Sequence, residues 1–257
     1  MIFNFSHLLH SKTIYLWSFL WCCCWGVVAQ QEVGDDVESD FTSQLWFDFD
    51  PSWQLAAHQK VRGNFGYRTI NPKSWHRVIF KGTFERDYDK LFFKRFKHKE
   101  TLLFGNAFFI LTKKDDYGSF EIRPYQGYSM SFNLTNRIVL GQTVRVEERF
   151  VFSGNPDNKV FGMRLRYQVK AVINLEGLWF GEDEGFYVPI AVEGFFNLVR
   201  ASEFNDVIRV TPGLGYQFNA GFKIEGSLAY HYSKEELDKL TRTNDIVFRF
   251  RIIKTIK

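Results

Sequence analysis

The sequence predicts an all-β protein, an antiparallel up-and-down transmembrane β-barrel of roughly ten to twelve strands. The first observation behind this prediction is the aromatic content, which is 18% and includes 29 Phe. The second is that charged residues make up 24% of the chain and the mean hydropathy is −0.23, values that exclude a helical membrane protein. The third is that apolar and charged positions alternate finely, as the wall of a barrel in lipid requires. A large soluble β-sandwich is the alternative.

The stretch 136–170 shows this alternation most clearly, as two strands joined by a turn at 153–158. Successive side chains of a strand point to opposite faces, so each strand has an apolar face and a charged face. In the first strand the apolar positions are Val144, Val146, Phe150 and Phe152, and the charged positions are Arg145, Glu147 and Arg149. In the second strand the apolar positions are Phe161, Met163, Leu165, Tyr167 and Val169, and the polar positions are Arg164, Arg166, Gln168 and Lys170.

Residues 1–29 are predicted to be a cleaved signal peptide. The apolar run 13–29 is shorter than the roughly 20 residues of a spanning helix, and it ends in small residues that suit cleavage before Gln30. A retained anchor and a lipoprotein signal are the alternatives, and Trp21 before Cys22 disfavours the second because a small residue normally stands there. All three cysteines lie in this segment, so the mature chain is predicted to lack disulfides and thiolate metal sites.

Residues 30–41 are acidic and polar and are predicted to form a flexible lead-in, and residues 42–257 a single barrel domain. Strands are predicted at 43–50, 54–68, 76–86, 101–111, 117–132, 136–152, 159–172, 186–198, 207–217, 222–232 and 246–252. Turn-forming residues separate many of them, among others Asp50-Pro51-Ser52, Asn71-Pro72, Asp115-Asp116 and Asn219-Ala220-Gly221. The polar segment 233–244 has room for one short helical turn.

The number of predicted strands is odd, which conflicts with a barrel whose two ends lie at the same rim. Two explanations are open: the first strand is not fully in the wall, or the segment 76–112 contains two strands that are merged here. No repeat of fixed period is present, which disfavours a propeller or a solenoid.

Short motifs distributed along the mature chain resemble those of a family of secreted bacterial proteins catalogued only as a domain of unknown function, number 2490. The resemblance covers about residues 44–252 and implies an outer-membrane β-barrel without known activity, and it brings no catalytic residues. A difference from most outer-membrane barrels is the end of the chain, which is not the aromatic residue read by the assembly machinery. Two explanations are open: Phe248 and Phe250 supply that signal internally, or the chain carries a short tail. The motifs are Gly66-Tyr67-Arg68, Arg145-x-Glu147-x-Arg149-Phe150, Arg164-x-Arg166-Tyr167, Phe195-Phe196-Asn197 and Gly213-x-Gly215-Tyr216.

A set of charged residues on neighbouring strands is the candidate functional site. In a closed barrel these side chains project into the lumen, where buried charges need partners of opposite sign. The first interpretation is a ladder of ion pairs that fills a narrow lumen and fixes strand register. An anion-selective lining or a small-molecule site is the functional alternative, and a solvated face of a soluble protein is the third. The residues are Arg145, Glu147, Arg149, Arg164, Arg166, Glu193, Glu121 and Arg123.

Glu148 interrupts the apolar face of its strand. A charge facing lipid at the middle of the bilayer costs about 2 kcal/mol or more. We therefore expect Glu148 near a membrane–water boundary or at a local bulge.

The remaining residues give no sign of catalysis. The histidines of the mature chain, His58, His76, His98 and His231, stand in no nucleophile or metal motif, so no catalytic residue, metal or cofactor is predicted. The basic run 94–99 is either a solvated turn or a patch for anionic lipid head groups or lipopolysaccharide phosphates. Nucleic acid is not an expected partner, because no other basic cluster is present.

These observations favour an integral protein of the bacterial outer membrane with a structural, transport or small-molecule-binding role and a lumen filled by charged side chains. Its expected partners are the lipid bilayer, lipopolysaccharide and the outer-membrane assembly machinery, and its ligand is unknown. The sequence leaves two alternatives open. One is an outer-membrane enzyme acting on lipid or lipopolysaccharide, and the other is a soluble periplasmic barrel that binds an apolar ligand.

Overall fold

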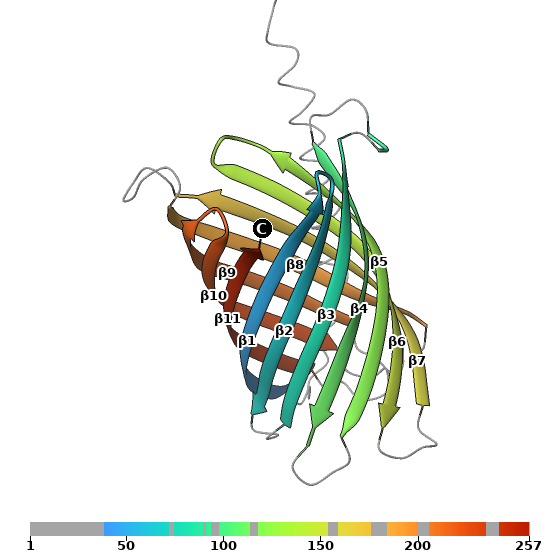
Figure 1. Ribbon diagram of the computed structural model, residues 1–257. Helices are drawn as coiled ribbons and strands as arrows, with labels where there is room; N and C mark the ends of the chain where they lie inside the picture. Colours follow the sequence, from blue (N-terminus) through green and yellow to red (C-terminus); the bar gives the residue numbers. More distant parts are fainter. Residues whose placement is uncertain are drawn as a thin grey trace, which may run out of the picture. The chain divides into compact units, whose positions relative to one another are not determined.

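The computed structural model of the chain is one closed β-barrel (Figure 1). The structure describes residues 39–71, 75–89, 91–93, 98–113, 118–153, 159–175, 184–199, 206–234 and 242–256. Within these residues no helix is long and apolar enough to cross a membrane. The strands are β1 (Ser39–Ala56), β2 (Gln59–Asn71), β3 (Trp75–Tyr88), β4 (Lys99–Thr112), β5 (Ser119–Asn133), β6 (Ile138–Ser153), β7 (Lys159–Asn174), β8 (Gly185–Val199), β9 (Asp206–Asn219), β10 (Phe222–Lys234) and β11 (Arg242–Ile256).

Consecutive strands pair antiparallel around the barrel, and β1 pairs with β11 in parallel. The predicted up-and-down barrel of roughly ten to twelve strands is therefore confirmed, with eleven strands in the described residues. Both explanations for the odd number were wrong, because β1 lies in the wall along its length and the segment 76–112 contains only β3 and β4. The parallel pair resolves the conflict: the closing strands β1 and β11 run in the same direction side by side (Figure 1).

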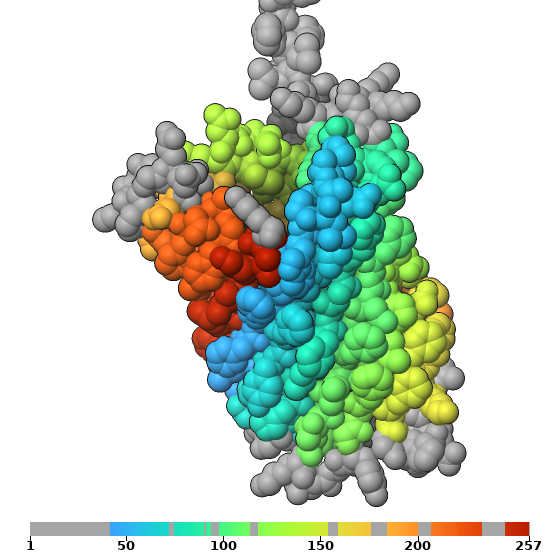
Figure 2. Space-filling model, in the orientation of Figure 1, coloured from blue at the N-terminus to red at the C-terminus, as the bar shows by residue number. Residues whose placement is uncertain are grey.

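Side chains alternate between the two faces of the wall as the sequence pattern predicts. In β1, Phe47 on the outer face is 51% exposed, and its neighbour Asp48 on the lumenal face is 4% exposed. In β6, Val144 and Phe150 lie outward, and Glu147 is completely buried. Figure 2 shows β1 to β5 as adjacent bands of side chains on one side of this wall. The polar interior and the apolar exterior are thus separated by a single sheet.

The prediction of a turn at Asp50-Pro51-Ser52 was wrong. β1 continues through Pro51 to Ala56, and the chain turns between β1 and β2 inside the predicted strand 54–68. Proline has a backbone angle close to that of an extended strand and removes only one ladder hydrogen bond. Pairing of Pro51 with Lys254 of β11 holds the strand in register at this point.

Several strands are longer than predicted. β1 begins at Ser39, inside the expected lead-in, and β11 runs from Arg242 to Ile256, so the final residues up to Ile256 are part of the wall rather than a tail. The ends of the segment 233–244 belong to β10 and β11, so only its residues 235–241 could form the possible helical turn. These residues, the predicted signal peptide, residues 30–38 and the basic residues 94–97 lie outside the described residues.

Candidate functional site

The candidate site lies in the lumen, where alternate residues of β5, β6, β7 and β8 bring the eight predicted residues together. We call these eight the lumenal charge network. Its centre is Glu147, whose carboxylate accepts hydrogen bonds from Arg145 and Arg164, the latter at 2.5 Å. Arg123 reaches the same carboxylate at 3.4 Å, and Arg166 lies 3.9 Å away. One buried carboxylate therefore has four guanidinium groups around it.

Two further carboxylates extend the network along the lumen. Glu121 binds Arg123 at 2.7 Å and Arg149 at 2.7 Å. Glu193, which is 3% exposed, accepts hydrogen bonds from Arg166 and Gln168. Because Arg123 and Arg166 each contact two carboxylates, all eight predicted residues belong to one connected set. Their role as a binding site stays a prediction.

Aromatic rings complete the packing of these cations. The guanidinium carbons of Arg164 and Arg166 lie 4.7 and 5.0 Å from the centroid of Phe195. Arg145 lies 4.7 Å from the centroid of Tyr125. Such contacts are worth more when both groups are desolvated, so the rings stabilise cations that the carboxylates share. The network is consistent with the first interpretation, a packed ion-pair ladder.

A second charge network lies at the seam between β1 and β11 and was missed from the sequence. Asp48 accepts a hydrogen bond from Arg249 at 2.5 Å, and Asp50 lies 3.2 Å from Arg251. Arg251 also contacts Glu225 of β10 at 3.1 Å. The sequence does contain a signal, since both strands carry charges two residues apart, but nothing local indicates that the two ends of the chain pair.

Basic residues outnumber acidic residues on the lumenal face. The acidic residues at inward positions of the described strands are Asp48, Asp50, Glu85, Asp87, Glu121, Glu147, Glu193, Glu225 and Asp245. The basic residues are Lys60, Arg62, Arg68, Arg77, Lys81, Lys99, Arg123, Arg145, Arg149, Arg164, Arg166, Lys170, Arg209, Lys223, Arg249 and Arg251. The lumen is therefore cationic.

Glu148 faces outward, as its place in the alternation requires. It stands opposite Met163 of β7, and the ladder between β7 and β8 shifts register between Met163 and Arg164. Neither ladder of β6 itself shifts register, so a bulge at Glu148 is not present, and the irregularity lies one strand away.

A buried carboxylate on the outer side of the wall was not predicted. Glu100, near the start of β4, is 0% exposed and accepts backbone hydrogen bonds from residues 91–93 at 3.0, 3.0 and 3.2 Å. The Tyr128 hydroxyl donates to it at 2.5 Å, and His98 Nε2 lies 2.8 Å away. Glu100 therefore fixes the chain that leads into β4 against the rim of the barrel. Sequence alternation does not predict the burial of Glu100, because its partners include backbone groups of residues 91–93, which lie outside the strands.

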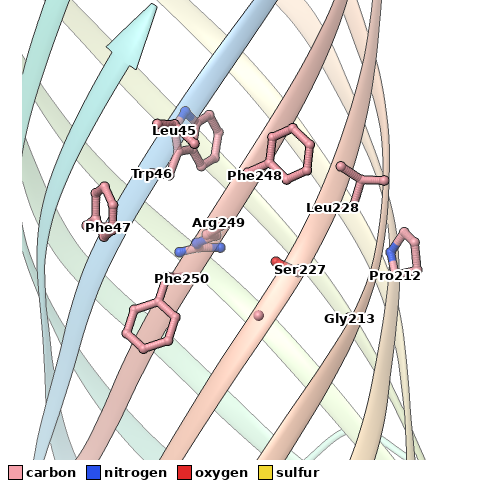
Figure 3. Close-up of a pocket in the computed structure, with 11 residues that line it drawn as sticks. Leu45, Trp46, Phe47, Pro212, Gly213, Ser227, Leu228, Phe248, Arg249 and Phe250 are labelled. Carbon is pink, nitrogen blue, oxygen red and sulfur yellow. The ribbon is translucent and has the colours of Figure 1, made fainter.

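The outer face also carries a groove of about 590 Å³ over β1, β11, β10 and β9 (Figure 3). Most of its lining belongs to the outward series of these strands. A side chain at Gly226 would meet nothing within 4 Å, which marks the open part of the groove. The apolar residues that line it are Leu45, Phe47, Pro212, Leu228, Phe248 and Phe250.

The histidines do not form a catalytic set among the described residues. His76 lies 2.8 Å from the Tyr67 hydroxyl, His98 contacts Glu100, and His231 packs against Trp46. No group of three or more His, Cys, Asp or Glu in the described part of the chain is arranged to hold a metal ion.

Together, the fold and the lumen define a closed β-barrel with an apolar exterior and a charged, densely packed interior. The chain belongs to the family described as protein of unknown function (DUF2490), whose model matches residues 25–241. The match ends immediately before β11. Comparisons with curated proteins and with solved structures gave no match.

Proposed function

We propose that this protein is an integral β-barrel of the bacterial outer membrane, with a structural, transport or small-molecule-binding role that depends on its charged lumen. The observation that carries the proposal is the apolar outer face. Large hydrophobic side chains are exposed around the whole wall, an arrangement opposite to that of a water-soluble barrel. Examples are Leu45, Phe47, Phe65, Phe80, Phe104, Val144, Phe161, Val192, Phe196, Leu214, Leu228 and Phe248.

Ionised residues on the outer face support the same proposal by their positions. In the strands with described side chains they are Arg86, Glu100, Glu148, Lys159 and Lys254. Four of these lie within three residues of a strand end, and Glu148 lies beside the register shift. A charge costs about 2–4 kcal/mol at the middle of a bilayer and about 0–1 kcal/mol near its surfaces, so this distribution suits a membrane-spanning wall.

The strands are also long enough to span a bilayer. They contain 13 to 18 residues, whereas a tilted strand needs about 9–11 to cross the hydrocarbon region. The lipid bilayer, lipopolysaccharide and the assembly machinery are the partners that follow from the proposal. In this setting the groove around Gly226 would be filled by acyl chains.

Fractionation of a Gram-negative host that expresses the full chain tests the proposal. We expect the protein in the outer-membrane fraction, resistant to an alkaline carbonate wash and released by detergent. Recovery from the periplasm without detergent would overturn the membrane assignment and favour a soluble barrel that binds an apolar ligand.

Two arginine variants of β6 sharpen this test. Val146→Arg places a charge on the outer face near the middle of the strand, and Phe152→Arg places it on the same face one residue from the end. A barrel in lipid loses about 2–4 kcal/mol with the first and 1 kcal/mol or less with the second. Equal total yields of the two folded variants would contradict the proposal, because a soluble barrel tolerates both.

A further inference from the structure

Trp46 is surrounded by cations on the lumenal side of the barrel. The guanidinium carbons of Arg68, Arg209 and Arg249 lie 3.6, 5.2 and 5.9 Å from the centroid of its ring, which is 4% exposed. The register of the wall explains this arrangement, since Arg68 of β2 and Arg249 of β11 both stand directly opposite Trp46 of β1. Three cations gathered around one ring repel one another, and such repulsion is stronger in a protein interior than in water.

Unpaired hydrogen-bond donors gather around the same ring. The donors Arg68 Nε and Arg209 Nε are buried and have no hydrogen-bond partner in the described part of the chain. His231 Nε2 also lacks a partner there, and it donates in only one of the two tautomers of the ring. His231 packs edge-on against Trp46 with a centroid distance of 5.4 Å. Arginine N–H groups can only donate, and buried donors in folded proteins almost always have an acceptor. Gln44 Oε1 is an acceptor beside Trp46, but it takes the indole N–H of Trp46 at 2.9 Å, and the two arginine Nε–H groups stay without an acceptor.

The carboxylates of this region do not supply those acceptors. Asp48 binds Arg249, and Glu193 is shared between Arg166 and Arg209. Arg68 forms no ion pair with a described carboxylate, and the ring of Trp46 is the group it covers. Asp245, the remaining carboxylate nearby, lies 3.9 Å from His231 Nδ1 and accepts hydrogen bonds from Gln44 and Thr42. The arginines around Trp46 thus share carboxylates that also bind other groups, and Arg68 has none of its own.

We propose that Trp46, Arg68, Arg209, Arg249 and His231, here called the Trp46 site, bind a small oxyanion. Phosphate or a carboxylate group provides both the negative charge and several acceptor oxygens, and planar guanidinium groups match such oxygens closely. The anion is either free or the acidic group of a larger molecule. The inference rests on the cationic lumen of the proposed function but not on the membrane location of the protein.

Binding of inorganic phosphate to the purified full-length protein in detergent tests this site. We expect one phosphate per chain in isothermal titration calorimetry. Arg68→Gln should weaken binding on the order of tenfold or more, because it removes one charge and its donors. The same variant should fold and should resist heating better than the wild type without phosphate, since it relieves repulsion between cations.

Lys81→Gln is the matched control. It removes the same charge from the lumenal face at a different place, 5.2 Å from the ring of Tyr125. We expect it to change phosphate affinity by about twofold or less, since the loss of a remote charge is largely screened. Equal weakening by Arg68→Gln and Lys81→Gln would overturn the site in favour of general attraction by the lumen. Absence of wild-type binding for both inorganic phosphate and a short-chain phosphatidic acid would overturn it as well.

The source of the anion is resolved by a second titration with a short-chain phosphatidic acid below its micellar concentration. Preference for inorganic phosphate identifies a free anion, and preference for the lipid identifies a head group. Both outcomes support the site if Arg68→Gln weakens the binding as expected. Tryptophan emission locates the event, because the phosphate-dependent change should disappear in Trp46→Phe. Failure of these titrations with successful fractionation would reject the site and leave the membrane proposal intact.

Discussion

Glu147 is the residue on which the lumenal charge network depends. It is completely buried and compensates four arginines, so its removal leaves cations in the interior without a partner. Breaking a buried pair in this way costs far more than breaking a pair at the surface.

Glu147→Gln is expected to lower the free energy of unfolding by about 3–5 kcal/mol, because glutamine keeps the shape and loses the charge. Denaturant unfolding of the detergent-solubilised protein measures this loss. The neighbouring Glu148→Gln is the control: it makes the same chemical change on the same strand but on the outer face, and should alter stability by about 0.5 kcal/mol or less. Similar losses in both variants would show that the network does not contribute as its geometry indicates.

At the scale of single residues the sequence predicts a great deal. Alternation alone places Arg145, Glu147 and Arg149 in the lumen, because each strand position has only two possible directions. Alternation does not reveal partners such as Arg209. This residue pairs with Glu193 from β9, a strand that carries none of the eight predicted site residues. Alternation also cannot indicate Glu100, whose partners come from a loop.

At the scale of elements, the seam between β1 and β11 is the part of the fold that differs most from expectation. Every other strand pair joins two strands that follow one another in the chain, whereas the seam joins the first strand to the last. Its register depends on side chains that match across it. These include Asp48 with Arg249, Thr42 with Asp245 at 2.5 Å, and Ser52 with Thr255 at 3.3 Å.

Exchanging the charges of Asp48 and Arg249 tests whether this pair sets the register of the seam. Asp48→Lys and Arg249→Glu should each lower the free energy of unfolding by about 3 kcal/mol, because each places like charges side by side in the lumen. The double variant should recover about half of the combined loss or more, which unfolding measurements in a double-mutant cycle would detect. Ser52→Ala, which removes only an uncharged contact, should cost about 1 kcal/mol. Additive losses in the double variant would contradict a register set by this pair.

The sequence predicts the antiparallel strands well, because each depends on local alternation and a nearby turn. The parallel seam depends on pairing between residues about 200 positions apart, for which a single sequence has no local signal. The mistaken turn at Pro51 has a related cause. Proline usually ends a strand, and only the pairing with β11 shows that this strand continues.

At the scale of the whole molecule, the lumen is occupied by its own side chains. Trp46, Tyr125 and Phe195 are nearly completely buried inside the barrel, and arginines pack over their rings. The interior of an eight-stranded barrel is just wide enough for its side chains, and eleven strands enclose more space, which these long side chains occupy. The filled lumen favours binding or slow passage over free diffusion.

Planar-bilayer recordings measure this property. The inserted wild-type protein should show no stable open conductance, because packed aromatic and charged side chains leave no continuous water path. Trp46→Ala combined with Phe195→Ala should produce measurable anion current, since it removes two large rings and leaves the cationic lining. Protease protection in the same vesicles confirms insertion, and a steady wild-type conductance like that of a wide porin would disprove the filled lumen.

The parallel seam also has a consequence for how the barrel is made. Until β1 meets β11, the protein is an open sheet with two unpaired edges, and each edge can pair with another chain. Joining them closes a ring of about 200 residues, the largest entropy loss of any single pairing step in the fold. Closure is therefore expected to be the last and slowest event of folding. The charged pairs of the seam would then favour pairing of β1 with β11 of the same chain over pairing with an exposed strand edge of another molecule.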